Sequence, residues 1–277
     1  MDLSAIIPTW NAAAHLAATL AALAAEAPDL SVIVADGGSS DDTLSIAAVA
    51  GARVVAAPLG RGRQLAAGVA AAGTEWVLLL HADTGLEAGW RAASEAFMAV
   101  PDNAARAGYF RFALASNDRR ARRLEWLVAW RCRRLSLPYG DQGLLIARRT
   151  LAEVGGIRPV PLMEDVDLMR RLGRRRLVAL APRAVTSAAR FEVEGWYWRS
   201  ARNLVCLSLW FAGVSPELIG RLYAREVRLE PLSGGYAQGA RPCRSAAPPG
   251  AAEAAGGSQV VSGAAGAATD RPAAHRR

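Results

Sequence analysis

Residues 30–43 read LSVIVADGGSSDDT, and this stretch shows how the chain is built. A short, mostly apolar run is followed directly by an acidic residue, two glycines and several side chains that favour helix starts. The run predicts a buried strand, and the polar residues after it predict the turn from that strand into a helix. The same succession recurs through the first hundred residues. It predicts strands at 3–7, 30–35, 53–56 and 76–80, and helices that begin near residues 11, 41, 64 and 87.

Strands and helices that alternate in this way predict an α/β fold with a Rossmann-like, mostly parallel central sheet and flanking helices. The second half is less regular. It predicts strands at 109–115, 143–147, 177–181 and 185–191, and helices at 118–135, 165–172, 195–212 and 216–228. Residues 232–277 are rich in Ala, Gly, Pro and Ser and bury too little apolar surface to fold. We therefore expect one domain, residues 1–231, and a disordered tail, residues 232–277.

Composition excludes several classes of protein. The chain has 277 residues and a formal net charge of +8, and every basic residue is Arg. Without Lys there is no Walker-type phosphate lysine and no lysine for a Schiff base or pyridoxal phosphate. The Arg-for-Lys usage indicates a coding bias, so the charge is not evidence for a nucleic-acid partner. The three cysteines support neither a disulfide framework nor a zinc cluster. The first residues do not resemble a signal peptide. Both observations predict a cytoplasmic protein.

The loop after the second predicted strand is the first candidate for ligand binding, because doubly wound sheets bind ligands beyond the carboxyl ends of their strands. Gly37 and Gly38 permit close approach of the backbone, and Asp36 can accept a hydrogen bond from a nucleotide's base or ribose. An ordinary strand-to-helix turn uses the same residue types. Asp41 and Asp42 argue against a phosphate at the start of the following helix.

The fourth predicted strand ends in a second candidate. His81 and Asp83 face the same way by strand alternation, and both residue types bind divalent cations, although a histidine at this place is also commonly structural. Arg61 and Arg63 precede an Ala-rich helix. They can neutralise a diphosphate or simply lie in solvent.

Three carboxylates, Glu164, Asp165 and Asp167, begin a helix after the apolar approach 159–163. Crowded like charges raise a pKa and suit a general base, whereas the plain alternative is an acidic first helical turn. A last polar cluster spans residues 139–143. Its Asp and Gln lie between glycines and can reach sugar hydroxyls, but the same letters also make an ordinary turn.

Six motifs succeed one another along the chain. They are Ile6-Ile7-Pro8-Thr9-Trp10-Asn11, Asp36-Gly37-Gly38-Ser39, Gly60-Arg61-Gly62-Arg63-Gln64, Leu80-His81-Ala82-Asp83-Thr84, Pro138-Tyr139-Gly140-Asp141-Gln142-Gly143 and Pro161-Leu162-Met163-Glu164-Asp165-Val166. Together they resemble glycosyltransferase family 2, whose members have the GT-A fold. The resemblance covers about residues 2–228. Within the family it is strongest to a small bacterial branch described as arsenosugar biosynthesis glycosyltransferases.

The resemblance implies an inverting transferase of the hexosyl type (EC 2.4). Such an enzyme moves a sugar from a nucleotide-sugar, here a UDP-linked one, to an acceptor hydroxyl with the help of Mg²⁺ or Mn²⁺. It implies donor contacts at Pro8, Thr9, Asn11, Asp36, Gly37, Ser39, Arg61, Arg63, Gln64 and Ala82. Contacts with the sugar or acceptor are implied at Tyr139, Asp141, Gln142 and Arg190.

The resemblance also assigns the chemistry. Asp165 matches the general base, with Glu164 beside it as a second catalytic candidate. Asp83 matches the last carboxylate of the family's metal motif, and His81 stands where many relatives have an acid. Arg190 lies in Ala-Arg-Phe-Glu, where the family has Arg-Arg-Trp-Glu.

Other interpretations stay open at this point. The loop at residues 8–11 lacks the glycine-rich motifs of sugar nucleotidyltransferases and of nicotinamide enzymes. A non-catalytic nucleotide-sugar-binding protein with a degenerate metal site is the alternative, as is a transferase at the inner face of the membrane with a lipid or carotenoid acceptor. The helix at 118–135 mixes arginines with Trp126 and Trp130, which suits either an anionic membrane surface or packing on the core. The acceptor, small or lipid-like, and the oligomeric state are not indicated.

Overall fold

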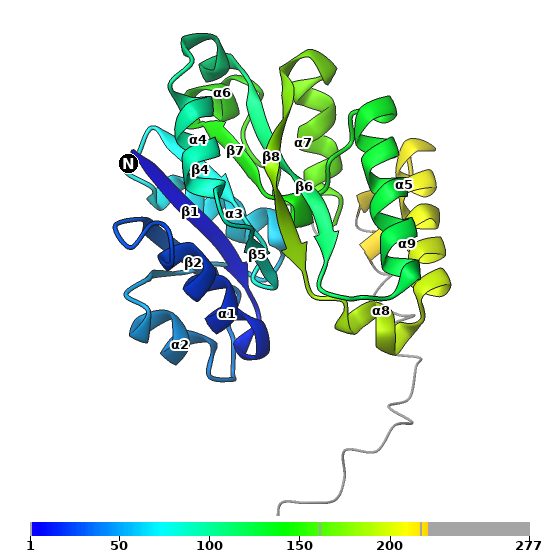
Figure 1. Ribbon diagram of the computed structural model, residues 1–277, viewed down its shortest axis with the longest axis horizontal. Coiled ribbons are helices and arrows are strands. Elements are labelled where there is room, and N and C mark those ends of the chain that lie inside the picture. The colour runs from blue at the N-terminus through cyan, green and yellow to red at the C-terminus, as the bar shows by residue number, and fades with distance from the viewer. Residues whose placement is uncertain (1, 161, 217, 221–277) are drawn as a thin grey trace, which may run out of the picture. The chain divides into compact units, whose positions relative to one another are not determined.

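The computed structural model describes residues 2–160, 162–216 and 218–220 (Figure 1). Its centre is an eight-stranded sheet with the strand order β3-β2-β1-β4-β7-β6-β8-β5. The strands are β1 (Leu3–Thr9), β2 (Ser31–Asp36), β3 (Arg53–Ala56), β4 (Trp76–Leu79), β5 (Thr84–Leu86), β6 (Ala107–Leu114), β7 (Leu144–Ala147) and β8 (Leu177–Thr186). The first four predicted strands are β1 to β4. They pair in parallel, as expected, whereas β7 and β5 run antiparallel to their neighbours.

Helices cover both faces of this sheet. They are α1 (Ala13–Ala24), α2 (Thr43–Val49), α3 (Arg61–Ala71), α4 (Trp90–Met98), α5 (Arg119–Leu135), α6 (Arg148–Glu153), α7 (Glu164–Leu172), α8 (Ala189–Glu194) and α9 (Trp196–Phe211). Alternate residues of β1 divide the core: Ala5 and Ile7 pack with α1 and α4, while Ile6 packs with α3 and α7. This period of two is what a strand covered on both faces requires.

The region around Pro182 differs from the expectation of two short strands. A single strand, β8, runs through it, and the strand predicted at 185–191 is wrong beyond Thr186 because residues 189–194 form α8. Proline has no N–H to donate to a neighbouring strand, so an interruption was the natural prediction. The sheet accommodates Pro182 with a shift of register: Tyr109 pairs with Ala179, and the next pair joins Arg111 to Arg183.

Two short elements, β5 and α6, have no counterpart among the predicted ones. The predicted helix at 216–228 is helical at residues 216 and 218–220, and its remaining residues lie outside the described part of the chain. The predicted tail, residues 232–277, lies outside it as well. Among the helices that the structure describes, none combines the length and the apolar character needed to cross a membrane.

Candidate functional site

The carboxyl ends of β1 and β2 are joined by hydrogen bonds that converge on Asp36. Its Oδ1 accepts from the hydroxyls of Thr9, at 2.9 Å, and Ser39, and its Oδ2 accepts from the N–H groups of Gly38 and Ser39, both at 2.8 Å. Burial alone would raise the pKa of Asp36, but the hydrogen bonds outweigh it and lower the pKa below its ordinary value. Asp36 is therefore an ionised carboxylate, and both of its oxygens already accept hydrogen bonds from within the protein.

Asn11 and Gln64 continue this network. Asn11 has a left-handed backbone with φ 47°, donates its N–H to the Ser39 hydroxyl at 2.9 Å and accepts from the Ser40 N–H at 2.9 Å. Gln64 is buried and donates to the carbonyls of Thr9, at 2.6 Å, and Ala35, at 3.1 Å. These side chains hold the loops after β1 and β2 in fixed positions.

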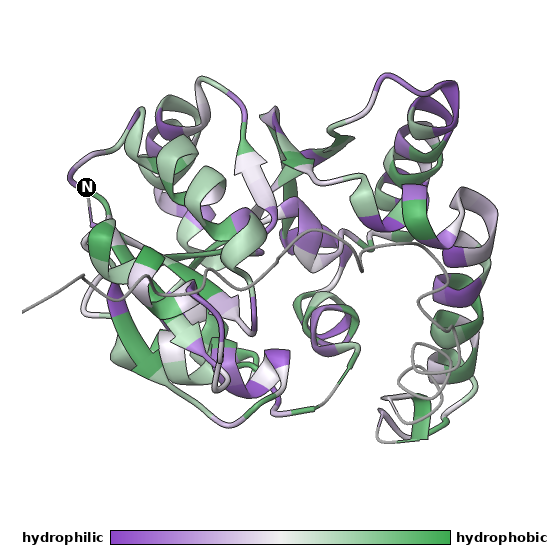
Figure 2. Ribbon diagram, turned by 90° about the horizontal axis from the view of Figure 1, so that it is seen from below, coloured by the Kyte–Doolittle hydropathy of each residue, from purple (hydrophilic) through white to green (hydrophobic). Residues whose placement is uncertain are grey.

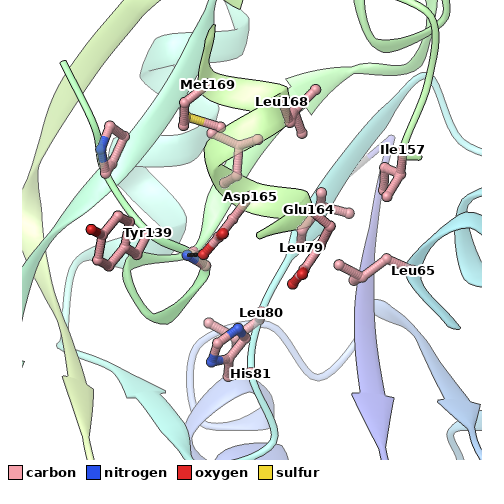
Figure 3. Close-up of a pocket in the computed structure, with 14 residues that line it drawn as sticks. Leu65, Leu79, Leu80, His81, Tyr139, Ile157, Glu164, Asp165, Leu168 and Met169 are labelled. Atoms are coloured by element: carbon pink, nitrogen blue, oxygen red, sulfur yellow. Dashed lines mark hydrogen bonds between the residues drawn. The ribbon is translucent and has the colours of Figure 1, made fainter. Parts of the chain in front are cut away.

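A pocket lies between α3, β4, α7 and the 3-10 turn η2 (Gly140–Gln142) (Figure 3). Its walls are largely apolar, with Leu65, Leu79, Ile157 and Met169 among them. Glu164 and Asp165 project into it from the start of α7, and His81 faces them from the end of β4. Two adjacent carboxylates in an apolar enclosure are costly to ionise together, which makes their partners decisive.

Arg61 lies between Glu164 and His81. Its Nε is 3.0 Å from Glu164 Oε1, and its Nη1 is 2.9 Å from His81 Nε2. Glu164 is 2% exposed, and burial raises its pKa from 4.5 to about 7 even though Arg61 acts in the opposite direction; the neighbouring Asp165 raises it further. Near neutral pH this carboxyl group is poised between its two charge states.

His81 is neutral in this setting. Burial of its ring, together with the positive charges of Arg61 and Arg190, places its pKa well below the ordinary 6.5. Because a guanidinium can only donate, His81 Nε2 accepts from Arg61, and the proton of the neutral ring sits on Nδ1. The lone pair that could bind a cation is directed at Arg61.

Asp165 is held by two backbone donors. Its Oδ2 accepts from the Gly140 N–H at 2.9 Å, and its Oδ1 accepts from the Val166 N–H at 2.8 Å. The turn at Gly140 passes close to the histidine, since a Cβ built on Gly140 would lie 2.6 Å from His81 Nε2. Asp165 is thus fixed in orientation with its side chain half-buried.

The turn η2 adds a third carboxylate, Asp141. Burial raises the pKa of Asp141 from 3.8 to about 6; Arg131 opposes the shift and Asp165 adds to it. Arg131 belongs to α5 and lies over the ring of Tyr139, 3.4 Å from its centre. Gln142 is buried and donates to the carbonyl of Phe110 at 3.0 Å, so its amide supports the turn rather than the pocket.

Comparison with known proteins identifies a family whose sequence profile matches part of the chain. Residues 4–141 match the sequence profile described as Glycosyl transferase family 2. Residues 4–141 therefore belong to this family. The matched segment holds the parallel half of the sheet, β1 to β4, and ends inside η2. No curated protein sequence matches the chain.

Solved structures of TarS share the fold. The structure of S. aureus TarS 1-349 has a TM-score of 0.53 and 15% identity over 76% of this chain and 65% of that one. The same protein in complex with UDP-GlcNAc has a TM-score of 0.52 and 16% identity, and the match covers 68% of this chain and 58% of that one. Glucosyl-3-phosphoglycerate synthase from Mycobacterium tuberculosis has a TM-score of 0.47 and 18% identity over 67% and 70%. The chain thus spans less than two thirds of TarS 1-349, with which it shares the GT-A fold.

The residues suggested by the family's motifs fall into three groups. One group is committed to internal hydrogen bonds, namely Thr9, Asn11, Asp36, Ser39, Gln64 and Gln142. The other group surrounds the pocket or acts on its charges, namely Arg61, His81, Asp83, Tyr139, Asp141, Glu164, Asp165 and Arg190. Pro8, Gly37 and Ala82 lie partly exposed at the strand ends, and Arg63 is exposed on α3.

Three positions of the site were given no role there by the sequence analysis. Gly140 supplies the N–H that orients Asp165, and Arg131 lies over Tyr139. Gly62 lies against the segment before α7, because a Cβ there would meet the Arg158 carbonyl oxygen at 2.4 Å. A glycine between two motif arginines was the only available signal for Gly62, and nothing in the sequence pairs Arg131 with Tyr139.

Proposed function

We propose that the chain is an inverting glycosyltransferase that moves a hexosyl group from a nucleotide-sugar, a UDP-linked one, to an acceptor hydroxyl. The observation that carries this proposal is the pair Glu164 and Asp165 in a largely apolar pocket at the carboxyl edge of the sheet. Ligands of doubly wound sheets bind at that edge. A single displacement needs one well-placed base and a stabilised leaving group, and the pocket offers candidates for both.

Asp165 is the proposed general base. Two backbone N–H groups fix its orientation, and such preorganisation is what proton abstraction from an acceptor hydroxyl requires. The proton would pass from the hydroxyl to Asp165 as the oxygen attacks the anomeric carbon and the nucleoside diphosphate departs. Glu164 would contribute by holding Arg61 at the pocket.

Arg61 is the proposed partner of the departing diphosphate. It is partly exposed, at 36%, and its guanidinium already reaches the pocket. Planar guanidinium groups match phosphate oxygens with two hydrogen bonds at once. Arg63 and Arg190 would add positive charge from the surface.

The fold family also implies a divalent cation, and the residues fit it in part. No group of three or more His, Cys, Asp and Glu side chains in the described chain could hold a metal, and His81 directs its lone pair at Arg61. Asp83 is a half-buried carboxylate, and Mg²⁺ commonly binds through one or two carboxylates together with substrate phosphates. Asp83 would therefore hold Mg²⁺ or Mn²⁺ jointly with the donor, and the cation would stabilise the leaving diphosphate as a Lewis acid.

One solved structure supports the proposed donor. TarS, which shares the fold, has been crystallised with UDP-GlcNAc, in keeping with a UDP-linked donor. Membership of the arsenosugar branch and a place in the cytoplasm or at the inner face of the membrane stay predictions from the sequence.

A panel of nucleotide-sugars incubated with the protein and Mn²⁺ tests the proposal, with release of free nucleotide as the readout and mass spectrometry of the product. Asp165→Asn should lose about 10² to 10⁴ in transfer rate while its nucleotide affinity is unchanged. The exposed Asp102→Asn is the matched control. Equal activity of Asp165→Asn would remove this residue from the role. A donor that binds but is never turned over would favour the non-catalytic alternative.

A further inference from the structure

The outward face of α9 is apolar. Tyr197, Trp198, Leu204, Val205 and Phe211 lie along it and are between 51% and 72% exposed. Tyr197, Leu204 and Phe211 are seven positions apart, or two helical turns, and Trp198 and Val205 stand next to them with the same separation, which places all five on one side of the helix. A helix that faces water normally shows the opposite pattern, with its charged residues outward.

The charged residues of α9 point inward instead. Arg199 and Arg202 are its two charged residues, and both pair with Glu194 at the end of α8. The Arg199 Nη1 to Glu194 Oε1 distance is 2.7 Å, and Arg202 is only 7% exposed. The exposed side of α9 therefore carries no charge over its whole length.

The outward face of α5 is both aromatic and basic. Trp126, Leu127 and Trp130 are exposed at its centre. Four exposed arginines flank them on the same side, namely Arg119, Arg123, Arg133 and Arg134. Ala121, Val128 and Cys132 are buried on the opposite side. No salt bridge joins any of the four arginines to a carboxylate within residues 2–160, 162–216 and 218–220.

The two helices lie side by side at one edge of the molecule (Figures 1 and 2). Near their first turns, the Arg120 guanidinium is 5.5 Å from the centre of the Trp196 ring. Near their last turns, Leu135 of α5 and Phe211 of α9 line one groove. Both of these side chains are about half exposed, so the two outward faces meet there. We call the two faces together the α5–α9 surface.

More positive charge borders this surface. The 3-10 turn η3 (Arg174–Arg176) follows α7, and Arg174 donates to the carbonyl of Arg133 at 3.4 Å. Arg174 and Arg175 are exposed. A second copy of the chain docked here face to face would bring like charges together, whereas anionic headgroups would neutralise them.

We propose that the α5–α9 surface docks on an anionic phospholipid bilayer. Amphipathic helices of this kind lie in the membrane plane, with aromatic and aliphatic side chains at the boundary between headgroups and acyl chains and with arginines on the phosphates. The uncharged face of α9 supplies the inserted part, and α5 and η3 supply the electrostatic part. The outward side chains that carry the proposal do not line the pocket, so docking stands independently of the transfer chemistry.

Flotation of the full chain with vesicles tests the proposal. The probe is phosphatidylcholine mixed with phosphatidylglycerol, about one lipid in three, compared with phosphatidylcholine alone. The protein should float with the anionic vesicles, and high salt should weaken the binding. Each arginine near a membrane surface adds about 1 kcal/mol, about fivefold in partition. The triple variant Arg119→Gln/Arg123→Gln/Arg134→Gln should therefore bind on the order of a hundredfold more weakly.

Matched variants distinguish the contribution of the α5–α9 surface from the effect of removing apolar side chains or arginines elsewhere on the protein. Leu204→Ser/Val205→Ser should lose vesicle binding, whereas Val49→Ser, which changes an even more exposed apolar side chain on α2, should not. Arg53→Gln/Arg106→Gln/Arg149→Gln is the control for charge, since these arginines are exposed elsewhere. Circular dichroism checks that each variant is folded.

Three outcomes would overturn the proposal. Wild-type protein that stays with the soluble fraction in the presence of anionic vesicles would do so directly. Binding that survives both sets of α5–α9 substitutions would place the membrane contact in another part of the chain. A dimer in sedimentation experiments that Leu204→Ser/Val205→Ser dissociates, without vesicle binding by the wild type, would assign the surface to a second copy.

Discussion

Replacing Glu164 by Gln should change how the stability of the protein depends on pH. Glu164 is almost completely buried, and its carboxyl group keeps its proton up to a pH of about 7, compared with 4.5 for an ordinary glutamate. Glutamine has nearly the same shape and is neutral at every pH. The substitution therefore removes the titration and leaves the packing of α7 largely intact.

The sign and size of the effect derive from proton linkage. Below pH 4.5 both the folded and the unfolded chain hold the proton, and burial of the neutral acid costs little. Between pH 4.5 and about 7 the unfolded chain has released the proton while the folded chain retains it, so the free energy of unfolding falls as the pH rises. One pKa unit corresponds to about 1.4 kcal/mol, which gives a loss of about 3 kcal/mol once the pH exceeds the folded pKa. Glu164→Gln should not show this loss.

Urea unfolding of wild type and Glu164→Gln across this pH range measures the effect. The difference in unfolding free energy, wild type minus variant, should decrease by about 3 kcal/mol from acid to neutral pH. Glu153→Gln is the control. Glu153 is exposed on α6, so this variant shows the effect of removing a carboxyl group that is not buried. Parallel stability curves for wild type and Glu164→Gln would refute the reasoning.

Three further substitutions test the site. Asp83→Ala should weaken nucleotide binding only in the presence of Mn²⁺, and calorimetric titrations with Mn²⁺ that are the same for wild type and variant would contradict its proposed role. Trp10 is 56% exposed at the end of β1, and base stacking on an aromatic side chain contributes about 1 to 3 kcal/mol, so Trp10→Ala should raise the nucleotide Kd at least fivefold without changing Tm. Gly140→Ala should displace the His81 ring, cost about 1 to 3 kcal/mol of stability and slow nucleotide release, whereas Gly73→Ala, whose Cβ meets nothing within 4 Å, should alter neither.

The parallel half of the fold was predictable because its signals are local. Apolar runs such as Leu78-Leu79-Leu80 are buried in the centre of the sheet, and the helix after each run begins within a few residues of its expected start. The second half depends on pairing between distant segments. Thr84 forms a strand only because it meets Thr186, more than a hundred residues away, and three residues carry too little pattern to announce it.

The loops of the site were predictable as a set, but the roles of individual side chains were not. Residue types that suit a nucleotide also suit the protein's own backbone, and Thr9, Asp36 and Gln64 are used internally. Sequence spacing likewise does not show which of Arg61 and Arg63 points into the pocket. Since they are two positions apart at the start of α3, they face different directions, and only Arg61 reaches Glu164.

Arg61 couples the charges of the pocket. It is the cation that opposes the effect of burial on Glu164, and it also engages the lone pair of His81. A diphosphate that drew Arg61 toward itself would remove this opposition, so Glu164 would hold its proton more tightly at the moment when the donor's negative charge enters. A neutral Glu164 would in turn place no second negative charge beside Asp165, the proposed base. The same arginine would then neutralise the leaving group, while Asp165, oriented by its two backbone donors, acts as the proposed base.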